Sequence, residues 1–261
     1  MPQPQPDPFL KEITLLRDRV ASFDSYPFSI PAVRHLDRLK LHPKVTYFIG
    51  DNGSGKSTLL EAIAIVEGLN AEGGSRNFNF STRASHSILC ECLRMTRGCR
   101  RLAKSDSFFL RAESFYNVAT ETERIGDSVF LERNYGGRLH EQSHGESFFS
   151  LMLARFRGNG LYLLDEPESA LSPSRQMSFL AILHDLVNRG SQFIIATHSP
   201  IVMAYPDSTI YRFSADGISA TAYTETENYK VTRSFLERRE QMLKELFSQD
   251  HGGPQLAAPT T

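Results

Sequence analysis

The chain has 261 residues, of which 40% are hydrophobic and 23% are charged, and its formal net charge is −1. This size allows one large α/β domain with a small lobe, and the near-zero charge excludes a global basic field that would draw the whole protein to nucleic acid. No apolar run approaches the ~18 residues that a membrane-spanning helix needs, and the Pro/Gln-rich start lacks the charged and apolar regions of a signal peptide.

The first fifth of the chain is predicted to form a helix followed by extended segments. Residues 9–22 are expected to form a short amphipathic helix. Residues 27–49 are strand-like, with Pro31 and Pro43 as breaks. Within them, residues 45–49 indicate a buried strand that leads into a glycine-rich segment.

This glycine-rich segment fits the phosphate-binding pattern G-x-x-x-x-G-K-[ST]. Apolar residues after it fall at helical spacing as far as Val66, and Gly68 suits the end of a helix. Strand, loop and helix are the setting that the motif needs, because backbone N–H groups close around phosphate oxygens and the helix N-terminus adds positive potential. A glycine-rich turn without a ligand is the alternative. The residues expected to bind the nucleotide are Gly50, Asn52, Gly53, Ser54, Gly55, Lys56, Ser57 and Thr58.

Two of these side chains have specific expected roles. Lys56 should reach the β- and γ-phosphates of a nucleoside triphosphate. The Ser57 hydroxyl should be a ligand of Mg²⁺. The sequence therefore predicts ATP and Mg²⁺ as cofactors of this loop.

The segment from about residue 69 to residue 142 is mixed and is expected to form a lobe. A helix is expected over residues 88–104, and an aromatic-rich strand over residues 107–116. The helix would gather five basic residues, either as a solvated face or as a contact to the phosphate backbone of nucleic acid. These are Arg94, Arg97, Arg100, Arg101 and Lys104.

The same segment contains all three cysteines. Cys90, Cys92 and Cys99 have the spacing C-x-C-x6-C, which matches no recognised zinc spacing. Free thiols are therefore expected. Unpaired cysteines without an export signal favour a reducing, cytoplasmic environment.

An alternation of helices and strands is predicted from residue 147 onwards. Ser172 and Pro173 indicate the start of one helix and Gly190 its end. The buried stripe of this helix is expected to be Met177, Leu180, Leu183, Leu186 and Val187. The other elements expected are a helix at 147–156, strands at 161–164 and 192–197, a hairpin of 209–213 and 218–223, and helical residues 227–248.

Three polar side chains follow buried strands and should meet at the carboxyl edge of the sheet. Asp165 ends the apolar run 161–164 and is expected to hold Mg²⁺, and Glu166 is placed to orient or deprotonate an attacking water. His198 follows the next strand, where it could contact a γ-phosphate. The alternatives are solvated carboxylates and a capping or core histidine.

A small turn before the helix at 147 is a weaker signal. Ser143, Gly145 and Glu146 lie in the sequence Ser-His-Gly-Glu-Ser, and a glycine-containing turn at a helix N-terminus can bind an anion. An ordinary N-cap with Glu146 in the first turn is the alternative.

Together these motifs resemble the ABC-type ATPase superfamily. The turn at 143–146 is similar to the family's signature, Asp165-Glu166 to its Walker B motif, residues 168–172 to its D-loop, and His198 to its switch histidine. The sequences of residues 49–57 and 196–200 resemble those of the SMC/RecF branch more than those of transporter ATPases. The chain is similar to small stand-alone bacterial ATPases of this branch, often called AAA family ATPases.

The resemblance implies a fold class and a domain plan. The fold is expected to be α/β, a P-loop NTPase of ABC-ATPase type with a mostly parallel central sheet flanked by helices, an antiparallel β subdomain and a small helical insert. Residues 9–249 would form a single domain, including the lobe at 69–142. Residues 1–8 and 250–261 would be disordered tails.

The resemblance also implies further site residues, and the sequence departs from the family at two places. Glu113 is the positional candidate for the Q-loop glutamine and metal ligand, or else a surface carboxylate. Tyr26 or Phe28 would stack on adenine, or else pack in the core. His144 replaces the first signature glycine, and Ser172 stands where aspartate is usual.

The function implied is Mg²⁺-dependent ATP hydrolysis by a non-transporter ATPase. Lys56, Glu166 and His198 would be its catalytic residues. In this family the signature of one subunit completes the site of the other, so an ATP-dependent homodimer is expected, with Ser143 and Gly145 of the partner at the γ-phosphate. The process is expected to be DNA maintenance or defence, with an unknown protein partner. The alternatives are an ATPase subunit of a membrane transporter and a non-hydrolysing ATP-sensing module.

Overall fold

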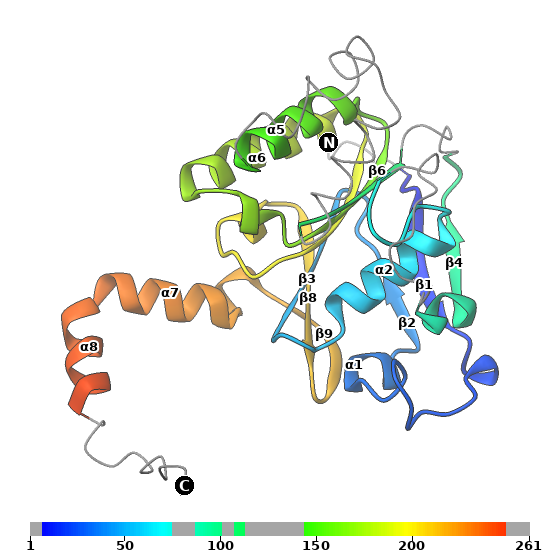
Figure 1. Cartoon of the computed structure of the whole chain (residues 1–261), viewed down its shortest axis with the longest axis horizontal. Helices are drawn as coiled ribbons and strands as arrows, with labels where there is room; N and C mark the ends of the chain where they lie inside the picture. Colours follow the sequence, from blue (N-terminus) through cyan, green and yellow to red (C-terminus); the bar gives the residue numbers. More distant parts are fainter. Residues whose placement is uncertain (1–6, 75–86, 101–106, 113–143, 249–261) are drawn as a thin grey trace, which may run out of the picture. The chain divides into compact units, whose positions relative to one another are not determined.

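The computed structural model describes residues 7–74, 87–100, 107–112 and 144–248, and it divides into two compact units, residues 1–221 and 222–261. The centre of the first unit is a six-stranded sheet in the order β5-β6-β7-β3-β8-β9 (Figure 1). Five of its strands run parallel and β9 is antiparallel to β8. The strands are β3 (Val45–Gly50), β5 (Ser107–Arg111), β6 (Leu161–Asp165), β7 (Gln192–Ala196), β8 (Ser208–Ser214) and β9 (Gly217–Thr221).

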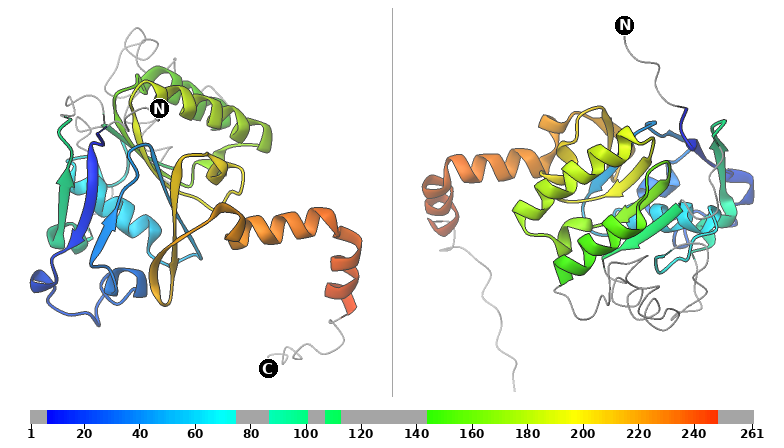
Figure 2. Two further views of the ribbon diagram at one scale, coloured as in Figure 1. Left: turned by 180° about the vertical axis from the view of Figure 1, so that it is seen from behind. Right: turned by 90° about the horizontal axis from the view of Figure 1, so that it is seen from above.

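Helices pack on both faces of this sheet, as a parallel sheet requires (Figures 1 and 2). Alternate residues of β6 show the two faces: Leu161 and Leu163 belong to a buried cluster with α2, whereas the Tyr162 ring stacks on Phe156 next to α5 at 4.2 Å between centroids. The α-helices of the first unit are α1 (Pro31–Arg34), α2 (Lys56–Val66), α5 (His144–Arg155) and α6 (Pro173–Asn188). Short 3₁₀ helices are η1 (Arg17–Arg19), η2 (Ile88–Cys92), η4 (Pro167–Ala170) and η5 (Val202–Ala204).

A second, antiparallel sheet in the order β2-β1-β4 packs with α2 in the same core. Its strands are β1 (Leu10–Leu15), β2 (Arg38–Lys40) and β4 (Leu93–Arg97). The expected α/β fold with a mostly parallel sheet and an antiparallel β subdomain is therefore confirmed.

Two helices expected from the sequence are strands instead. Residues 9–22 contain β1, the central strand of the small sheet, whose pairing on both sides overrides the weak helical periodicity. Residues 88–104 contain η2 and then β4, in which Leu93 and Met95 are less exposed than Arg94 and Thr96. This alternation has the period of a strand, so Arg94 and Arg97 lie on a strand and not on a helix face.

The buried face of α6 differs from the prediction: Met177 is exposed, Leu180 is only half-buried, and Phe179 is buried instead. Ser172 caps the helix as expected, since its Oγ accepts from Arg175 N. Phe179 and Leu183 are fully buried, but Met177 is 59% exposed. Met177 lies six residues before Leu183, about 120° away around the helix, which places it off the buried face.

The N-terminal strand is tied to the large sheet by one buried amide. Gln192, at the start of β7, is 1% exposed. Its Oε1 accepts from Phe9 N and Leu10 N at 3.0 and 2.9 Å, and its Nε2 donates to Leu10 O and His42 O at 2.8 and 3.0 Å. The side chain thus meets the backbone hydrogen-bonding needs of two other segments.

The second unit contains helices, as predicted for residues 227–248. It comprises η6 (Tyr223–Glu225), α7 (Glu227–Glu237) and α8 (Arg239–Ser248). Thr226 caps α7 by accepting from Tyr229 N, and it is the one buried residue among residues 222–248. No helix in the described part of either unit is long and apolar enough to cross a membrane.

Candidate nucleotide site

A cavity of about 680 Å³ lies at the carboxyl edge of the large sheet. It is lined by residues from the glycine-rich loop, from the tip of β6, from the segment after β7 and from the segment before α1. The predicted residues that line it are Tyr26, Asn52, Gly53, Gly55, Lys56, Ser57, Thr58, Glu166 and His198. The structure therefore brings together side chains up to 172 positions apart in the sequence.

Glycines shape the loop between β3 and α2. Gly55 precedes α2 with a φ of 99°, in the left-handed region. A Cβ on Gly55 would lie 2.9 Å from Ile30 Cγ2, so a larger residue would also collide with a neighbouring segment. The loop thus turns directly into a helix N-terminus, where free backbone N–H groups favour an anion.

Lys56 is the buried cation of the cavity. Its Nζ donates to Gly50 O and Asp51 O, both at 2.8 Å, and the residue is 4% exposed. Burial lowers the pKa of Lys56, while the nearby carboxylates of Glu166, Asp165, Asp51 and Glu168 act in the opposite direction. A cation surrounded by acidic groups offers the charge that a bound triphosphate needs.

Ser57 and Asp165 provide a fitting donor set for Mg²⁺. Ser57 Oγ donates to Asp165 Oδ1 at 2.9 Å, and Asp165 is 6% exposed. A hydroxyl and a carboxylate oxygen are hard ligands of the kind that Mg²⁺ prefers, and Mg²⁺ commonly uses one or two protein oxygens together with phosphate oxygens.

Glu166 and His198 face each other across the tips of β6 and β7. Their closest atoms, Glu166 Oε1 and His198 Nε2, are 3.7 Å apart. Glu166 adopts a left-handed conformation with a φ of 51°, and its N–H donates to Ala196 O at 2.9 Å. His198 N donates to Glu168 Oε1 at 2.6 Å. Backbone bonds on both sides therefore fix the positions of the predicted water-activating acid and of the switch histidine.

The two aromatic residues expected to stack on adenine, Tyr26 and Phe28, differ in their exposure and position. Phe28 is 3% exposed and belongs to the hydrophobic core. Tyr26 is 69% exposed and lines the cavity, with its hydroxyl 3.4 Å from Thr58 Oγ1. Of the two, Tyr26 is placed where it could contact a bound base.

Several predicted residues cannot be placed at the cavity. Ser143 and Glu113 lie outside the described residues, and Gly145 belongs to the first turn of α5 and is not among the residues that line the cavity. Glu146 lies in the first turn of α5, is exposed, and pairs with Arg175 of α6 at 3.6 Å.

Two of the basic residues of 88–104, Arg97 and Arg100, make contacts within the first unit. Arg97 pairs with the buried carboxylate of Glu67 at 2.7 Å. Arg100 NH1 donates to Gly190 O at 2.8 Å, and its guanidinium lies over the Phe9 ring. Arg101 and Lys104 lie outside the described residues. Cys90, Cys92 and Cys99 are free thiols.

Sequence reasoning missed a guanidinium next to Asp165, the carboxylate that accepts the Ser57 hydroxyl. Arg111 Nε lies 3.4 Å from Asp165 Oδ2, and Arg111 NH1 donates to Glu61 Oε2 at 2.9 Å. Two signals could have found this group: Glu61 follows Ser57 by one helical turn, and Arg111 ends a strand beside the Asp165 strand.

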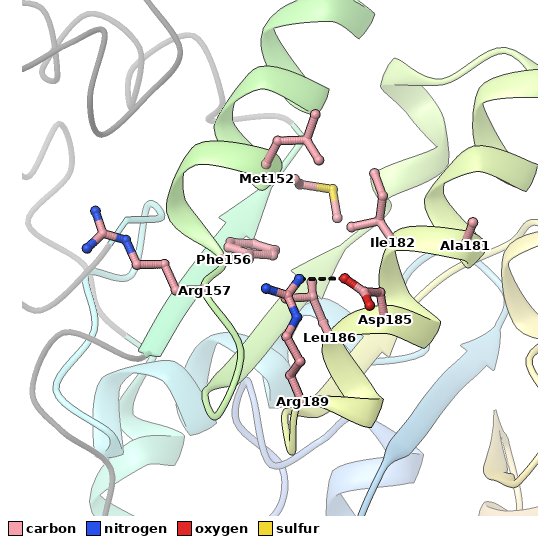
Figure 3. A pocket seen from close by; sticks show the side chains of 9 residues that line it. Met152, Phe156, Arg157, Ala181, Ile182, Asp185, Leu186 and Arg189 are labelled. Carbon is pink, nitrogen blue, oxygen red and sulfur yellow. Dashed lines mark hydrogen bonds and ion pairs between the residues drawn. The ribbon is translucent and has the colours of Figure 1, made fainter.

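A second cavity, of about 420 Å³, lies between α5 and α6 (Figure 3). Its lining includes Met152, Phe156 and Ile182, and Arg189 and Asp185 form an ion pair of 2.7 Å beside it. None of the predicted site residues that the structure describes lines this cavity.

Models of two protein families match separate parts of the chain. The model described as "AAA domain" covers residues 21–126, and the model described as "AAA domain, putative AbiEii toxin, Type IV TA system" covers residues 138–204. The first match includes the glycine-rich loop, and the second includes Asp165, Glu166 and His198.

Curated relatives are ATP-binding proteins of transport systems. The thiamine import ATP-binding protein ThiQ of Cereibacter sphaeroides is 31% identical over 166 residues, which are 58% of this chain and 69% of ThiQ. The ABC transporter G family member STR2 of Medicago truncatula is 28% identical over 171 residues, and the chain covers 24% of its length. Among solved structures, the SMC head domain from Thermotoga maritima has 18% identity and a TM-score of 0.47, with coverage of 82% of this chain and 99% of that one.

The parallel sheet with its loop-to-helix phosphate site defines a P-loop ATPase. Since ThiQ is 31% identical and the chain covers more than two thirds of its length, the chain belongs to the ABC-type ATPases. Its activity is the hydrolysis of ATP.

Proposed function

We propose that this ATPase is a switch that dimerises with ATP, with Mg²⁺ as its cofactor, and that it acts in the cytoplasm outside membrane transport. The observation that carries the proposal is the convergence of Lys56, Ser57, Glu166 and His198 on one cavity. These groups supply a phosphate-binding cation, a metal ligand, a general base and a charge-stabilising imidazole.

Each side chain has a step in the proposed reaction. Lys56 and the loop amides hold the β- and γ-phosphates. Ser57 and Asp165 hold the metal, which when bound neutralises charge on the phosphate oxygens. Glu166 takes a proton from the attacking water, and His198 stabilises charge on the transferred phosphoryl group.

The position of Glu146 supports a site shared between two copies. Glu146 is the one member of this turn with a described side chain, and it pairs with Arg175 instead of lining the cavity. A second copy could place Ser143 and Gly145 at the γ-phosphate, so that ATP joins two chains and hydrolysis releases them.

The first test uses a variant that binds ATP without hydrolysing it. Glu166→Gln is expected to form a dimer with ATP and Mg²⁺, so its mass by light scattering should rise from 29.4 kDa to about twice that value. The double variant Lys56→Ala/Glu166→Gln should stay a monomer under the same conditions. A Glu166→Gln protein that remains monomeric at saturating ATP contradicts the dimer proposal.

The same substitution tests the role of Glu166 in chemistry. We expect the turnover of Glu166→Gln to fall by about 100-fold or more, because the amide cannot accept a proton. The affinity for ATP should stay within about threefold, because the group acts on water. Phosphate release measured under steady-state conditions gives the first quantity and calorimetry gives the second. Retained turnover would remove Glu166 from the general-base role.

A transporter subunit is the second candidate, because ThiQ is named as an import ATP-binding protein. A subunit of this kind should co-purify with an integral membrane protein from detergent extracts.

A role in DNA maintenance or defence is our proposal for the process, in keeping with the toxin–antitoxin system named in the family description. DNA binding that weakens as salt rises would support contact with nucleic acid.

A further inference from the structure

A single guanidinium holds the carboxylates on the inner side of the metal-binding pair. Arg111 lies between Asp165 and Glu61, at 3.4 Å from the first carboxylate and 2.9 Å from the second. The side chains of Arg111 and Glu61 are 19% and 18% exposed, and that of Asp165 is 7% exposed. This ion-pair group is therefore shielded from water. Charge interactions in such a shielded position are stronger than at the surface.

Secondary structure fixes the three groups in place. Arg111 is the last residue of β5 and is the direct neighbour of Asp165 on β6, and Ala112 N donates to Asp165 O at 3.1 Å. Glu61 follows Ser57 by one turn of α2, so both side chains lie on the same side of that helix. The arginine is thus adjacent to the pair Ser57–Asp165 without lining the cavity described above.

The two oxygens of Asp165 have different partners. Oδ1 accepts the Ser57 hydroxyl at 2.9 Å, and Oδ2 faces Arg111. The guanidinium orients the carboxylate so that one oxygen points to the metal-binding side. It also supplies positive charge where Asp165 and Glu61 would otherwise attract a divalent cation.

We propose that Arg111 is a positioning residue that makes metal binding depend on nucleotide. With Arg111 in place, its positive charge already compensates the negative charge of the Asp165 and Glu61 carboxylates. The metal then gains enough ligands only when phosphate oxygens join Ser57 and Asp165. Without Arg111, Asp165 and Glu61 bind a divalent cation by themselves. This inference rests on the proposed metal site, and it adds a control over when that site is filled.

The test measures binding of Mn²⁺ alone to the full chain, by calorimetry and by the electron paramagnetic resonance signal of free Mn²⁺. Arg111→Met should bind Mn²⁺ about 10-fold or more tightly than the unchanged protein in the absence of nucleotide, because a repulsive charge next to the carboxylates is removed. Arg111→Lys keeps the charge and should stay within about threefold of the unchanged protein. The double variant Arg111→Met/Glu61→Gln should lose the gain.

Arg97→Met is the matched control, because Arg97 also pairs with a buried carboxylate, but that carboxylate belongs to Glu67 and not to Asp165 or Glu61. It should share any loss of stability with Arg111→Met and show no gain in Mn²⁺ affinity. Equal Mn²⁺ affinities of Arg111→Met and the unchanged protein would overturn the proposal.

If Arg111→Met does not fold, Glu61→Gln gives a second test with the arginine retained. Arg111 then pairs with Asp165 alone, so Mn²⁺ affinity with ATP should fall by about threefold or more, and an unchanged or higher affinity contradicts the inference. Mn²⁺ binding to the unchanged protein with ATP separates the two proposals. If ATP does not promote Mn²⁺ binding there, the metal site itself is wrong; if it does and Arg111→Met shows no gain, only the role of Arg111 fails.

Discussion

Replacing Lys56 with alanine is expected to lower the affinity for ATP by about 100-fold or more. Lys56 is 4% exposed, and its ammonium group lies near the carboxylates of Asp51, Asp165, Glu166 and Glu168. Its removal deletes charge-assisted hydrogen bonds to phosphate and leaves the nearby carboxylates without their cation, so the site repels a triphosphate more strongly. Titration with a fluorescent ATP analogue in the presence of Mg²⁺ measures the effect.

A second lysine provides the control for this experiment. Lys44 pairs with Asp207 at 2.5 Å and does not line the cavity. Lys44→Ala removes the same charge from the chain and should leave ATP affinity within about twofold. If Lys56→Ala, shown to be folded by circular dichroism, binds ATP as tightly as Lys44→Ala, Lys56 is not the phosphate-binding residue.

Replacing Gln192 with leucine is expected to destabilise the first unit by about 3 kcal/mol or more. The change leaves the N–H groups of Phe9 and Leu10 and the carbonyl of His42 without the partner they have inside the protein. An unsatisfied buried polar group costs about 1–3 kcal/mol, and several lose their partner at once. Leucine has a similar volume, so the effect reports hydrogen bonding and not a cavity.

Urea unfolding followed by circular dichroism measures this loss as a lower midpoint with an unchanged slope. Ser178→Ala is a suitable control, because this residue is exposed on α6 and its hydroxyl contacts only the helix backbone among the bonds described. It should change the free energy of unfolding by less than about 0.5 kcal/mol. Equal midpoints for the two variants would show that the Gln192 bonds do not stabilise the unit.

The sequence predicts best where a local signal and the tertiary environment agree. The strand, glycine loop and helix from residue 45 to residue 66 carry several consistent signals, and all are found in the structure. The segments containing β1 and β4 were predicted as helices, because strand pairing with distant residues decides their conformation and leaves little local trace. The pairing of Leu15 with Leu93 joins positions 78 residues apart, which no window of local sequence can show.

In the candidate site, too, residues with a local sequence signal were predicted, and contacts between distant segments were not. Motif spacing located Lys56, Ser57, Asp165, Glu166 and His198, because each follows a recognisable strand or loop. Arg111 contacts Asp165 from the neighbouring strand, and Glu168 accepts from His198 N across the strand tips, so both contacts depend on the three-dimensional arrangement.

Main-chain hydrogen bonds continue across the strand tips beyond the regular sheet. Ala112 N donates to Asp165 O, Glu166 N to Ala196 O and Thr197 N to Phe48 O, at 3.1, 2.9 and 3.1 Å. The tips of β5, β6, β7 and β3 are thus joined without any side chain of the site. The backbone at this edge therefore does not depend on the side chains of Glu166 and His198. A protein engineer could replace both side chains with other reactive groups and keep the same backbone positions for new phosphate chemistry.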